Sequence, residues 1–290
     1  MKPASFRHLQ PASVDEALAM LAEHGADARI LAGGQSLVPM MNFRLARPAV
    51  LIDINRIPDL AFIEDAGSSL RIGAMTRERA VETSALVKSS APLIHAATEN
   101  IAHLPIRSRG TVGGSIANAD PAAEYPAAVL ALDATLVAKS VRGERRIAAA
   151  DFFQGVLTTA LEADEMLTEI VVPKAPAGSG AAFVELSRRH GDLAMAGVGC
   201  EIVLSGDTVT GIRLGVCGVG AGPVRLRAAE AALLGKTLGQ ASIVAAARAA
   251  SAEVDPESDV HASADYRRRL AGVMTKRAVE AAAAKIGQPA

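Results

Sequence analysis

The chain has 290 residues, half of them hydrophobic, which is enough for two or three compact units. Its formal net charge is −1, so no long-range electrostatic field favours nucleic acid or an anionic membrane. Aromatic residues make up only 3% and Trp is absent, which argues against stacking platforms for single-stranded nucleic acid. No apolar run approaches the roughly 20 residues that span a bilayer, and the N-terminus lacks the apolar core of a signal peptide, so we expect a cytoplasmic protein without a transmembrane segment.

The first predicted unit is a small β-α-β subdomain within residues 1–57. Ser13 and Glu16 form a capping-box pattern ahead of a helix over residues 14–24, and Gly25 is placed to end that helix. The runs "ARILAGG" and "AVLIDI" predict two buried strands. The segment between them contains two adjacent glycines.

Residues 58–175 predict a larger subdomain built on a mixed sheet. Its expected elements are a strand at "SSLRIGA", a helix at "RERAVETSALV" capped by Thr76, a helix at "APLIHAATENIAHL", a short helix and a strand at "AAVLALDATLVAKS", and a strand at "EMLTEIVVP". Residues 174–180, "KAPAGSG", have the composition of a linker. We therefore expect one N-terminal domain over residues 1–175.

Residues 176–290 predict a second domain of antiparallel strands followed by three helices. The strand candidates are "AAFVELSRR", "MAGVGCEIVLSG" and "TVTGIRLGVCGVG", with a hairpin signal at "SGD". The helix candidates are "LRAAEAALLG", "ASIVAAARAASAEV" and "SADYRRRLAGVMTKRAVEAAAAKI". Strands followed by helices indicate an α+β layer rather than an alternating parallel sheet, so the predicted fold class is α+β.

Two glycine segments, Gly33-Gly34-Gln35-Ser36 and Gly113-Gly114-Ser115, are the candidate binding elements. A phosphate is bound by several backbone N–H groups at once, and glycine leaves those groups accessible. Asn118, Asp120 and Glu124 follow the second segment and offer acceptors for ribose or ribityl hydroxyls. A ligand with two phosphates and a polyol, such as a flavin dinucleotide, would use all of these groups. The alternative is that each Gly-Gly pair is an unrelated turn.

Other patterns predict no catalytic or metal site in this chain. Gly218 and Gly220 begin a dinucleotide-type G-x-G-x-x-G, but Pro223 takes the third glycine position, so we predict a tight strand-to-helix turn. Cys200 and Cys217 are too few for an ordinary iron–sulfur cluster and are expected to be buried. None of the six His forms an H-x3-H or HExxH pair.

Three charged stretches are expected to be solvated. They are Asp164-Glu165, "SRRHGDLA" at residues 187–194, and the cluster of Arg267, Arg268, Arg269, Lys276 and Arg277 in the last helix. For the second stretch a phosphate or partner contact through Arg188 or Arg189 is the alternative. For the last cluster the alternative is docking to a partner protein.

The glycine segments and their surroundings resemble a known family. "AGGQSLVPMMNFRLARP" and "RGTVGGSIANADPAAEYPA" look like the two FAD loops of the medium subunit of the molybdenum hydroxylases, the carbon monoxide dehydrogenase and xanthine dehydrogenase family. "SRRHGDLAMAGV" and "SADYRRRLAGVMTKRAVEAA" are similar to the start and end of its C-terminal domain. The resemblance runs along nearly the whole chain.

The resemblance implies FAD as the cofactor of this chain and a role for each residue that matches the family. The pyrophosphate would be surrounded by Ala32, Gly33, Gly34, Gln35, Ser36 and Leu37, and the other phosphate wall would be formed by Thr111, Gly113, Gly114 and Ser115. Glu124 would hydrogen-bond the ribityl chain, and Ile101 would pack near the flavin ring. Leu167 would lie near the ring or the adenine and contact it through its main chain. It implies no catalytic side chain and no metal ligand here.

The same resemblance implies partner subunits. A small subunit would carry two [2Fe-2S] clusters and a large subunit the molybdopterin, in a dimer of heterotrimers. Substrate would be oxidised at molybdenum in another chain, and FAD would pass the electrons to an external acceptor. Some relatives that use a nicotinamide acceptor carry a Lys where Val184 or Glu185 stands, so NAD, a quinone or another acceptor stays open.

Two rival hypotheses differ from this electron-transfer role. A stand-alone flavin-dependent oxidoreductase would turn over a small substrate without partners, although the chain offers no catalytic constellation for it. A non-enzymatic scaffold subunit would use its glycine segments only as turns.

Overall fold

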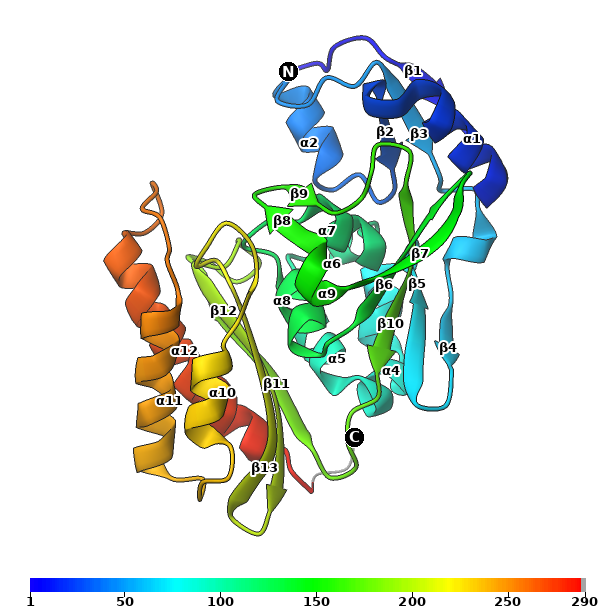
Figure 1. Ribbon diagram of the computed structural model, residues 1–290. Coiled ribbons are helices and arrows are strands. Elements are labelled where there is room, and N and C mark those ends of the chain that lie inside the picture. Colours follow the sequence, from blue (N-terminus) through cyan, green and yellow to red (C-terminus); the bar gives the residue numbers. More distant parts are fainter. Residues whose placement is uncertain (288–290) are drawn as a thin grey trace.

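The computed structural model describes residues 1–287, in which three main sheets set the architecture (Figure 1). A small parallel sheet comes first, a five-stranded sheet second and a four-stranded antiparallel sheet third. The α+β class expected from the sequence is confirmed. The second sheet was expected to be mixed, but all of its strand pairs are antiparallel. Within residues 1–287 no helix is both long and apolar enough to cross a membrane.

The N-terminal sheet has the strand order β1-β3-β2 and lies between two helices (Figure 1). Its elements are β1 (Arg7–Leu9), α1 (Val14–His24), a 3-10 turn (Gly25–Asp27), β2 (Ala28–Leu31), α2 (Leu37–Asn42) and β3 (Val50–Asp53). The Ser13 hydroxyl accepts from the N–H of Glu16, which confirms the predicted cap. Neither β1 nor α2 is predicted by the sequence patterns.

The second sheet has the order β4-β5-β10-β6-β7, and helices α3 to α9 accompany it. Its elements are a 3-10 turn (Pro58–Leu60), β4 (Ile63–Asp65), β5 (Ser69–Gly73), α3 (Glu78–Thr83), α4 (Ala85–Ser90), α5 (Pro92–Asn100), α6 (Leu104–Arg107), α7 (Val112–Asn118), α8 (Glu124–Ala131), β6 (Thr135–Ser140), β7 (Gly143–Ala148), α9 (Ala149–Phe152), the short hairpin β8 (Phe153–Gly155) and β9 (Thr158–Thr159), and β10 (Met166–Pro173).

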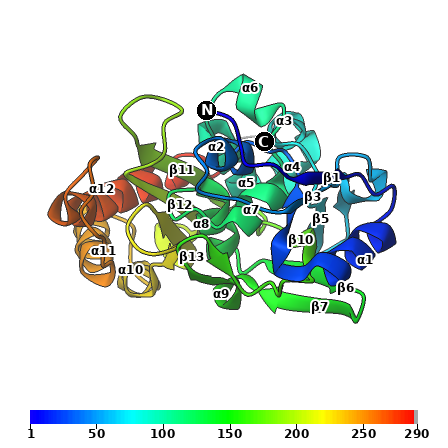
Figure 2. The same ribbon diagram turned by 90° about the horizontal axis from the view of Figure 1, so that it is seen from above.

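The third sheet has the order β11-β12-β13-β14, and three helices cover one of its faces (Figures 1 and 2). Its elements are β11 (Gly180–Leu186), β12 (Ala196–Ser205), β13 (Thr208–Cys217), β14 (Val224–Arg225), α10 (Arg227–Leu233), α11 (Gln240–Glu253) and α12 (Ala264–Ala283). The predicted hairpin between the second and third strands is confirmed. Cys200 and Cys217 are buried as predicted.

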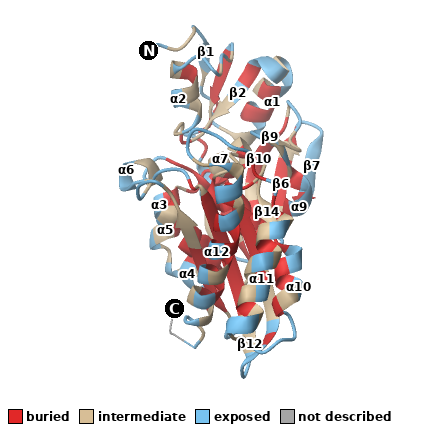
Figure 3. Ribbon diagram, turned by 90° about the vertical axis from the view of Figure 1, so that its left-hand side faces the viewer, coloured by how far each residue is buried: buried red, intermediate tan, exposed pale blue. Residues whose placement is uncertain are grey.

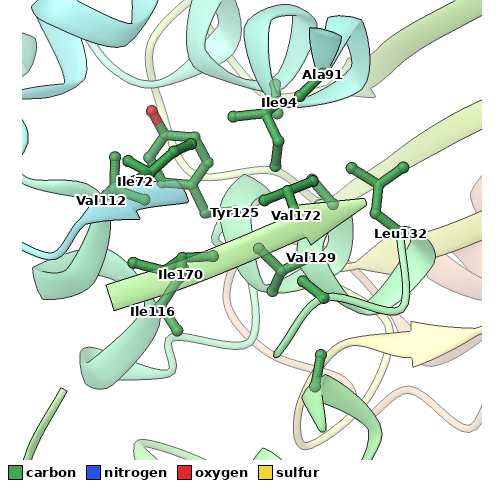
Figure 4. Close-up of a cluster of buried hydrophobic side chains, with 14 of the residues drawn as sticks. Ile72, Ala91, Ile94, Val112, Ile116, Tyr125, Val129, Leu132, Ile170 and Val172 are labelled. Carbon is green, nitrogen blue, oxygen red and sulfur yellow. The ribbon is translucent and has the colours of Figure 1, made fainter. Parts of the chain in front are cut away.

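Helix α8 joins the second and third sheets. All of its residues are buried, and it packs against β12 and β13. The approach to β13 is so close that a Cβ on Gly215 would overlap the carbonyl oxygen of Ala127. Tyr125 points into the shared core, where its hydroxyl lies 2.8 Å from the Thr98 hydroxyl (Figure 4). The buried interior therefore runs from one sheet into the next (Figure 3).

Two helix predictions need correction. The helix expected over "RERAVETSALV" is split into α3 and α4, because the Ser84 hydroxyl accepts from the N–H of Val87 and caps a new helix there. Thr76 caps neither helix, since its hydroxyl donates to the carbonyl of Phe62 at 2.8 Å. The next predicted helix ends at Asn100 instead of continuing to Leu104.

Two of the charged stretches expected to be solvated contain a buried member. Glu165 is buried and forms a two-point ion pair with Arg145, both nitrogen–oxygen distances being 2.7 Å. Arg267 of α12 is also buried, and its guanidinium donates to the carbonyls of Met195 at 2.8 Å and Gly218 at 2.7 Å. Neither burial shows in local sequence, because the groups that enclose these side chains lie far away along the chain.

Arg267 connects α12 to the turns that flank β12 and β13, and Asp259 completes its contacts at 2.8 Å. We expect Arg267→Ala to lower the free energy of unfolding by about 2–4 kcal/mol, because two buried carbonyls lose a charged donor. Urea unfolding measures the effect. The matched control is Arg269→Ala on the exposed side of the same helix, which should change stability by less than about 0.5 kcal/mol. Equal effects of the two changes would contradict this structural role.

Candidate functional site

The first glycine segment, Ala32–Leu37, connects β2 to α2. Gly34 has φ +72°, a left-handed conformation that favours glycine. The Gln35 side-chain amide donates to the carbonyl of Gly33 at 2.8 Å and holds the turn. Within residues 1–287, the backbone N–H groups of Gly33, Gly34, Gln35 and Ser36 have no acceptor. Consecutive N–H groups without a protein acceptor are suited to binding an oxyanion.

The second glycine segment is the start of helix α7 rather than an open loop. Thr111 is its N-cap, and the hydroxyl accepts from the N–H of Gly114 at 3.1 Å. The N–H of Gly113 donates to the carbonyl of Ala74 at 2.9 Å, and that of Ser115 to the carbonyl of Thr111 at 3.0 Å. These three N–H groups are therefore already bonded within the protein. The segment can still offer the partly exposed Ser115 hydroxyl, whereas Gly113 is buried against Ala74.

The two glycine segments are in direct contact although about eighty residues separate them. A Cβ on Gly33 would overlap the carbonyl oxygen of Arg109 and lie 2.8 Å from the Cα of Gly110. A Cβ on Gly114 would lie 3.6 Å from the Cβ of Ala32. Because only glycine permits this approach at Gly33, the contact requires glycine for packing as well as for backbone access. The two segments therefore lie side by side in the folded chain.

A polar brace holds the two segments together from outside. Arg77 donates to the carbonyl of Arg109 at 2.5 Å and to the side-chain oxygen of Asn55 at 2.7 Å. The Asn55 amide nitrogen in turn donates to the carbonyl of Ala32 at 2.8 Å. Asn55 and Arg77 also line a hollow of about 390 Å³ beside the brace. The brace thus ties Ala32, just after β2, to Arg109, three residues before the start of α7.

The remaining residues implied by the family resemblance lie in the middle of the molecule. Ile101 follows α5 and Leu167 lies on β10; both are buried in one apolar cluster. Ser115 and Asn118 are partly exposed on α7, and Glu124 begins α8. The structure therefore joins the glycine segments to each other, places Glu124 at the end of the connection from α7, and encloses Ile101 and Leu167 in the core.

Two buried glutamates, Glu78 and Glu124, and the half-buried Glu185 lie in this region, and no cation within residues 1–287 fully balances them. Burial, and next the carboxyl of Glu185, raise the pKa of Glu124 to about 8. Burial raises the pKa of Glu78 to about 7, although Arg107 opposes the shift. Burial likewise raises the pKa of Glu185 to about 7. One carboxyl oxygen of Glu78 and one of Glu185 are buried with no hydrogen-bond partner in residues 1–287.

The Glu78 carboxyl and the Asn55–Arg77 brace were missed by the sequence analysis. Glu78 lies against the backbone of Gly110, where a Cβ would collide with the carboxylate. These residues stand in ordinary helix-start and strand-end sequence and form no motif. The one signal in the sequence is Gly110 of "RSRGTV". The reason for a glycine at this position becomes clear only in the folded chain, where the Glu78 carboxyl lies against it.

The buried glutamates predict how stability depends on pH. In the unfolded chain a glutamate ionises near its ordinary value of 4.5, whereas Glu124 in the folded chain keeps its proton up to about pH 8. The folded state therefore binds more protons, and stability should fall as the pH rises from about 4.5 to 8. Each unit of pKa difference is worth about 1.4 kcal/mol. In urea unfolding, the stability of Glu124→Gln should fall less steeply with pH than that of the unchanged chain. The exposed Glu23→Gln is the control and should show the same pH dependence as the unchanged chain. Equal slopes for the two variants would contradict the role of Glu124.

Comparisons with known proteins agree along the whole chain. Residues 4–175 match the family model described as "FAD binding domain in molybdopterin dehydrogenase", and residues 181–282 match "CO dehydrogenase flavoprotein C-terminal domain". The carbon monoxide dehydrogenase medium chain of Hydrogenophaga pseudoflava is 42% identical over 98% of this chain and 99% of its own length. The 6-hydroxypseudooxynicotine dehydrogenase complex subunit alpha of Paenarthrobacter nicotinovorans is 44% identical over 96% of this chain and 94% of its own length.

A solved structure gives the same result. The structure of carbon monoxide dehydrogenase from Hydrogenophaga pseudoflava contains a chain that superimposes with a TM-score of 0.97 at 44% identity, covering 99% of this chain and 100% of that chain. Identity above 40% over nearly the full length of the relatives establishes a common family. The chain belongs to the family of FAD-binding flavoprotein subunits of the molybdopterin dehydrogenases, the subunits known in carbon monoxide dehydrogenase as medium chains.

Proposed function

We propose that this chain binds FAD between its two glycine segments and passes electrons from the [2Fe-2S] clusters of a partner subunit to an external acceptor. The observation that carries the proposal is the contact between Gly33 and the backbone of Arg109 and Gly110, next to N–H groups that have no acceptor among residues 1–287. A diphosphate needs such a site, because its charge is met best by several preorganised donors.

Each implied contact has a defined part in this proposal. The N–H groups of Gly33 to Ser36 donate to the pyrophosphate, and the Ser115 hydroxyl completes the opposite wall. Gly113 and Gly114 contribute close packing of this wall rather than hydrogen bonds, because their N–H groups are already bonded and Gly113 is buried against Ala74. Glu124, which is protonated near neutral pH, can donate to a ribityl oxygen as well as accept from a hydroxyl.

Ile101 and Leu167 are proposed to shape the site from the core side. Both are buried, so they define the depth of the site rather than contact phosphate. The redox chemistry is that of bound FAD, which links one-electron donors to a two-electron acceptor, while the protein binds and orients it.

The proposed organisation places the FAD-binding domain at residues 1–175, with subdomains at about 1–57 and 58–175, and the C-terminal domain at residues 176–290. The partners are a large molybdopterin subunit and a small [2Fe-2S] subunit in a dimer of heterotrimers. The relatives are subunits of dehydrogenases that are named for different compounds, among them carbon monoxide and 6-hydroxypseudooxynicotine. That variety supports a substrate site on another chain. The cytoplasmic location stays a prediction.

FAD reconstitution tests the proposed cofactor. We expect the purified chain to acquire a flavin absorbance spectrum on incubation with FAD. At a hundredfold excess of FAD over its dissociation constant, stability should rise by about 2.7 kcal/mol. A thermal melt with and without FAD measures the gain. If neither the spectrum nor the melting temperature responds to FAD, the proposed function fails.

A glycine substitution tests the proposed place of binding. Gly33→Ala should weaken FAD binding at least about tenfold, or about 1.4 kcal/mol, because its Cβ would push the two segments apart. The control is Gly239→Ala in the C-terminal unit, where an added Cβ would meet no atom within 4 Å. Fluorescence titration measures both affinities, and circular dichroism checks that each variant is folded. A folded Gly33→Ala variant with unchanged affinity would place the cofactor elsewhere.

A further inference from the structure

Glu185, near the end of β11, carries a carboxyl group that the proposed function does not use. Phe183, two residues earlier on the same strand, packs in the central apolar cluster together with Ile101 and Leu167. Val184 packs instead in the cluster formed with the three C-terminal helices. Because side chains alternate along a strand, Glu185 is on the same face as Phe183. It therefore points to the side of the sheet where the family resemblance implies the flavin ring, near Ile101.

The backbone of β12 brings Glu185 close to the start of α8. Gly197 pairs with Glu185 on one side and with Cys217 on the other. A Cβ on Gly197 would lie 2.9 Å from the Cys217 sulfur and 3.2 Å from the Glu185 Cβ. The N–H of the residue after Cys217 donates to the carbonyl of Pro121 at 2.7 Å, and α8 begins shortly afterwards at Glu124. Two acidic side chains from distant parts of the chain thus meet at this junction.

The Glu185 carboxyl has no partner that would hold it ionised. One of its oxygens is buried and makes no hydrogen bond within residues 1–287. Burial is the cause that raises the pKa of Glu185 to about 7. The side chain is only half-buried, so protons from solvent can reach it. A carboxyl in this setting changes its protonation near neutral pH, whereas a paired surface glutamate stays ionised there.

The charged groups around this carboxyl are mostly acidic. Burial, and next the charge of Glu185, raise the pKa of Glu124, which means that the two carboxyls interact. Arg107 is a cation that acts on Glu78 and lowers its pKa against the effect of burial. The titratable groups of the surrounding elements are Glu78 of α3, Arg107 of α6, Asp120 after α7, Tyr125 of α8 and Cys217 of β13, with His103 and His190 beside the turn that follows β11.

We propose that Glu185 is a redox-linked proton site, which takes up a proton from solvent when two electrons reach the FAD bound beside it. This inference rests on the proposed function, because it needs FAD in the adjoining site. Glu185 acts through its charge on the cofactor and is not proposed to hold it. The neighbouring Glu124 keeps the role of a ribityl contact.

The charge balance of the step explains why the proton is taken up. Two electrons and one proton go to the flavin ring, which gains one negative charge. A second proton goes from water to the Glu185 carboxylate, which loses one negative charge. A new negative charge near a carboxyl disfavours its ionised form, so reduction draws this proton in. When the two electrons leave for the external acceptor, the carboxyl returns its proton to solvent.

The test is an anaerobic redox titration of the full-length chain loaded with FAD, from about pH 6 to pH 9. One proton per two electrons changes the equilibrium tenfold per pH unit, which is about 30 mV, and two protons change it by about 59 mV. Above about pH 7 we expect the midpoint potential of the unchanged chain to approach the steeper slope. Glu185→Gln has the same size but cannot ionise, so its slope should stay near the shallower one. At about pH 6 the two slopes should coincide, because Glu185 is then protonated in both oxidation states.

Glu201→Gln is the matched control in the same sheet. Glu201 is also buried with one oxygen that makes no hydrogen bond within residues 1–287, but Arg213 lies 3.1 Å from its other oxygen. It stands four residues along β12 from Gly197, or roughly 13 Å away. Its slope should match that of the unchanged chain. Fluorescence titration should give the same FAD affinity for all three chains, and circular dichroism checks that each is folded.

Three results would overturn the proposed proton site. Equal slopes for Glu185→Gln and the unchanged chain above pH 7 would mean that Glu185 takes up no proton. The same loss of slope in Glu201→Gln would assign the effect to buried charge in general. A folded Glu185→Gln chain that binds FAD at least tenfold more weakly at every pH would make Glu185 a contact of the cofactor. By contrast, failure of the unchanged chain to bind FAD would refute the proposed function itself, and this inference with it.

Discussion

The arrangement of this protein depends on the contact between Gly33 and the backbone of Arg109 and Gly110. A single added carbon at Gly33 would overlap the carbonyl oxygen of Arg109, which also accepts a hydrogen bond from Arg77. The contact brings the end of a parallel strand against the start of a helix from another sheet. In the described part of the chain, the N–H groups of Gly33 to Ser36 have no acceptor, whereas those of Gly113, Gly114 and Ser115 are bonded. The two segments, although alike in sequence, therefore have different chemical roles.

Support for this contact comes from both sides. The Asn55–Arg77 brace joins the two segments by hydrogen bonds to their carbonyls. Behind them lies Glu78, whose burial raises its pKa to about 7 and leaves one carboxyl oxygen without a hydrogen-bond partner in residues 1–287. A poorly solvated site strengthens the electrostatic contact of a bound diphosphate with backbone donors. The same burial makes the region sensitive to pH, because its glutamates resist ionisation.

The C-terminal sheet holds the second half of the site in place. Helix α8 starts at Glu124 and is buried between two sheets, and the N–H of Gly218 donates to the carbonyl of Pro121 at 2.7 Å. Arg267 bonds the same Gly218 from α12. The polar residues after α7 are thus positioned by helices and strands from far along the chain. Rigid support of this kind favours a site that binds a cofactor in one orientation.

The sequence by itself determined the α+β class, most strands, the cap at Ser13 and the family, because hydrophobic periodicity, turn residues and the two glycine motifs are local signals. The tertiary structure alone decided that Thr111 caps α7, that Ser84 divides one predicted helix into two, and that Glu78, Glu165 and Arg267 are buried. It also decided which glycine N–H groups stay available. Those outcomes depend on partners that are distant in the sequence, and a local pattern carries no information about the atoms that will surround it after folding.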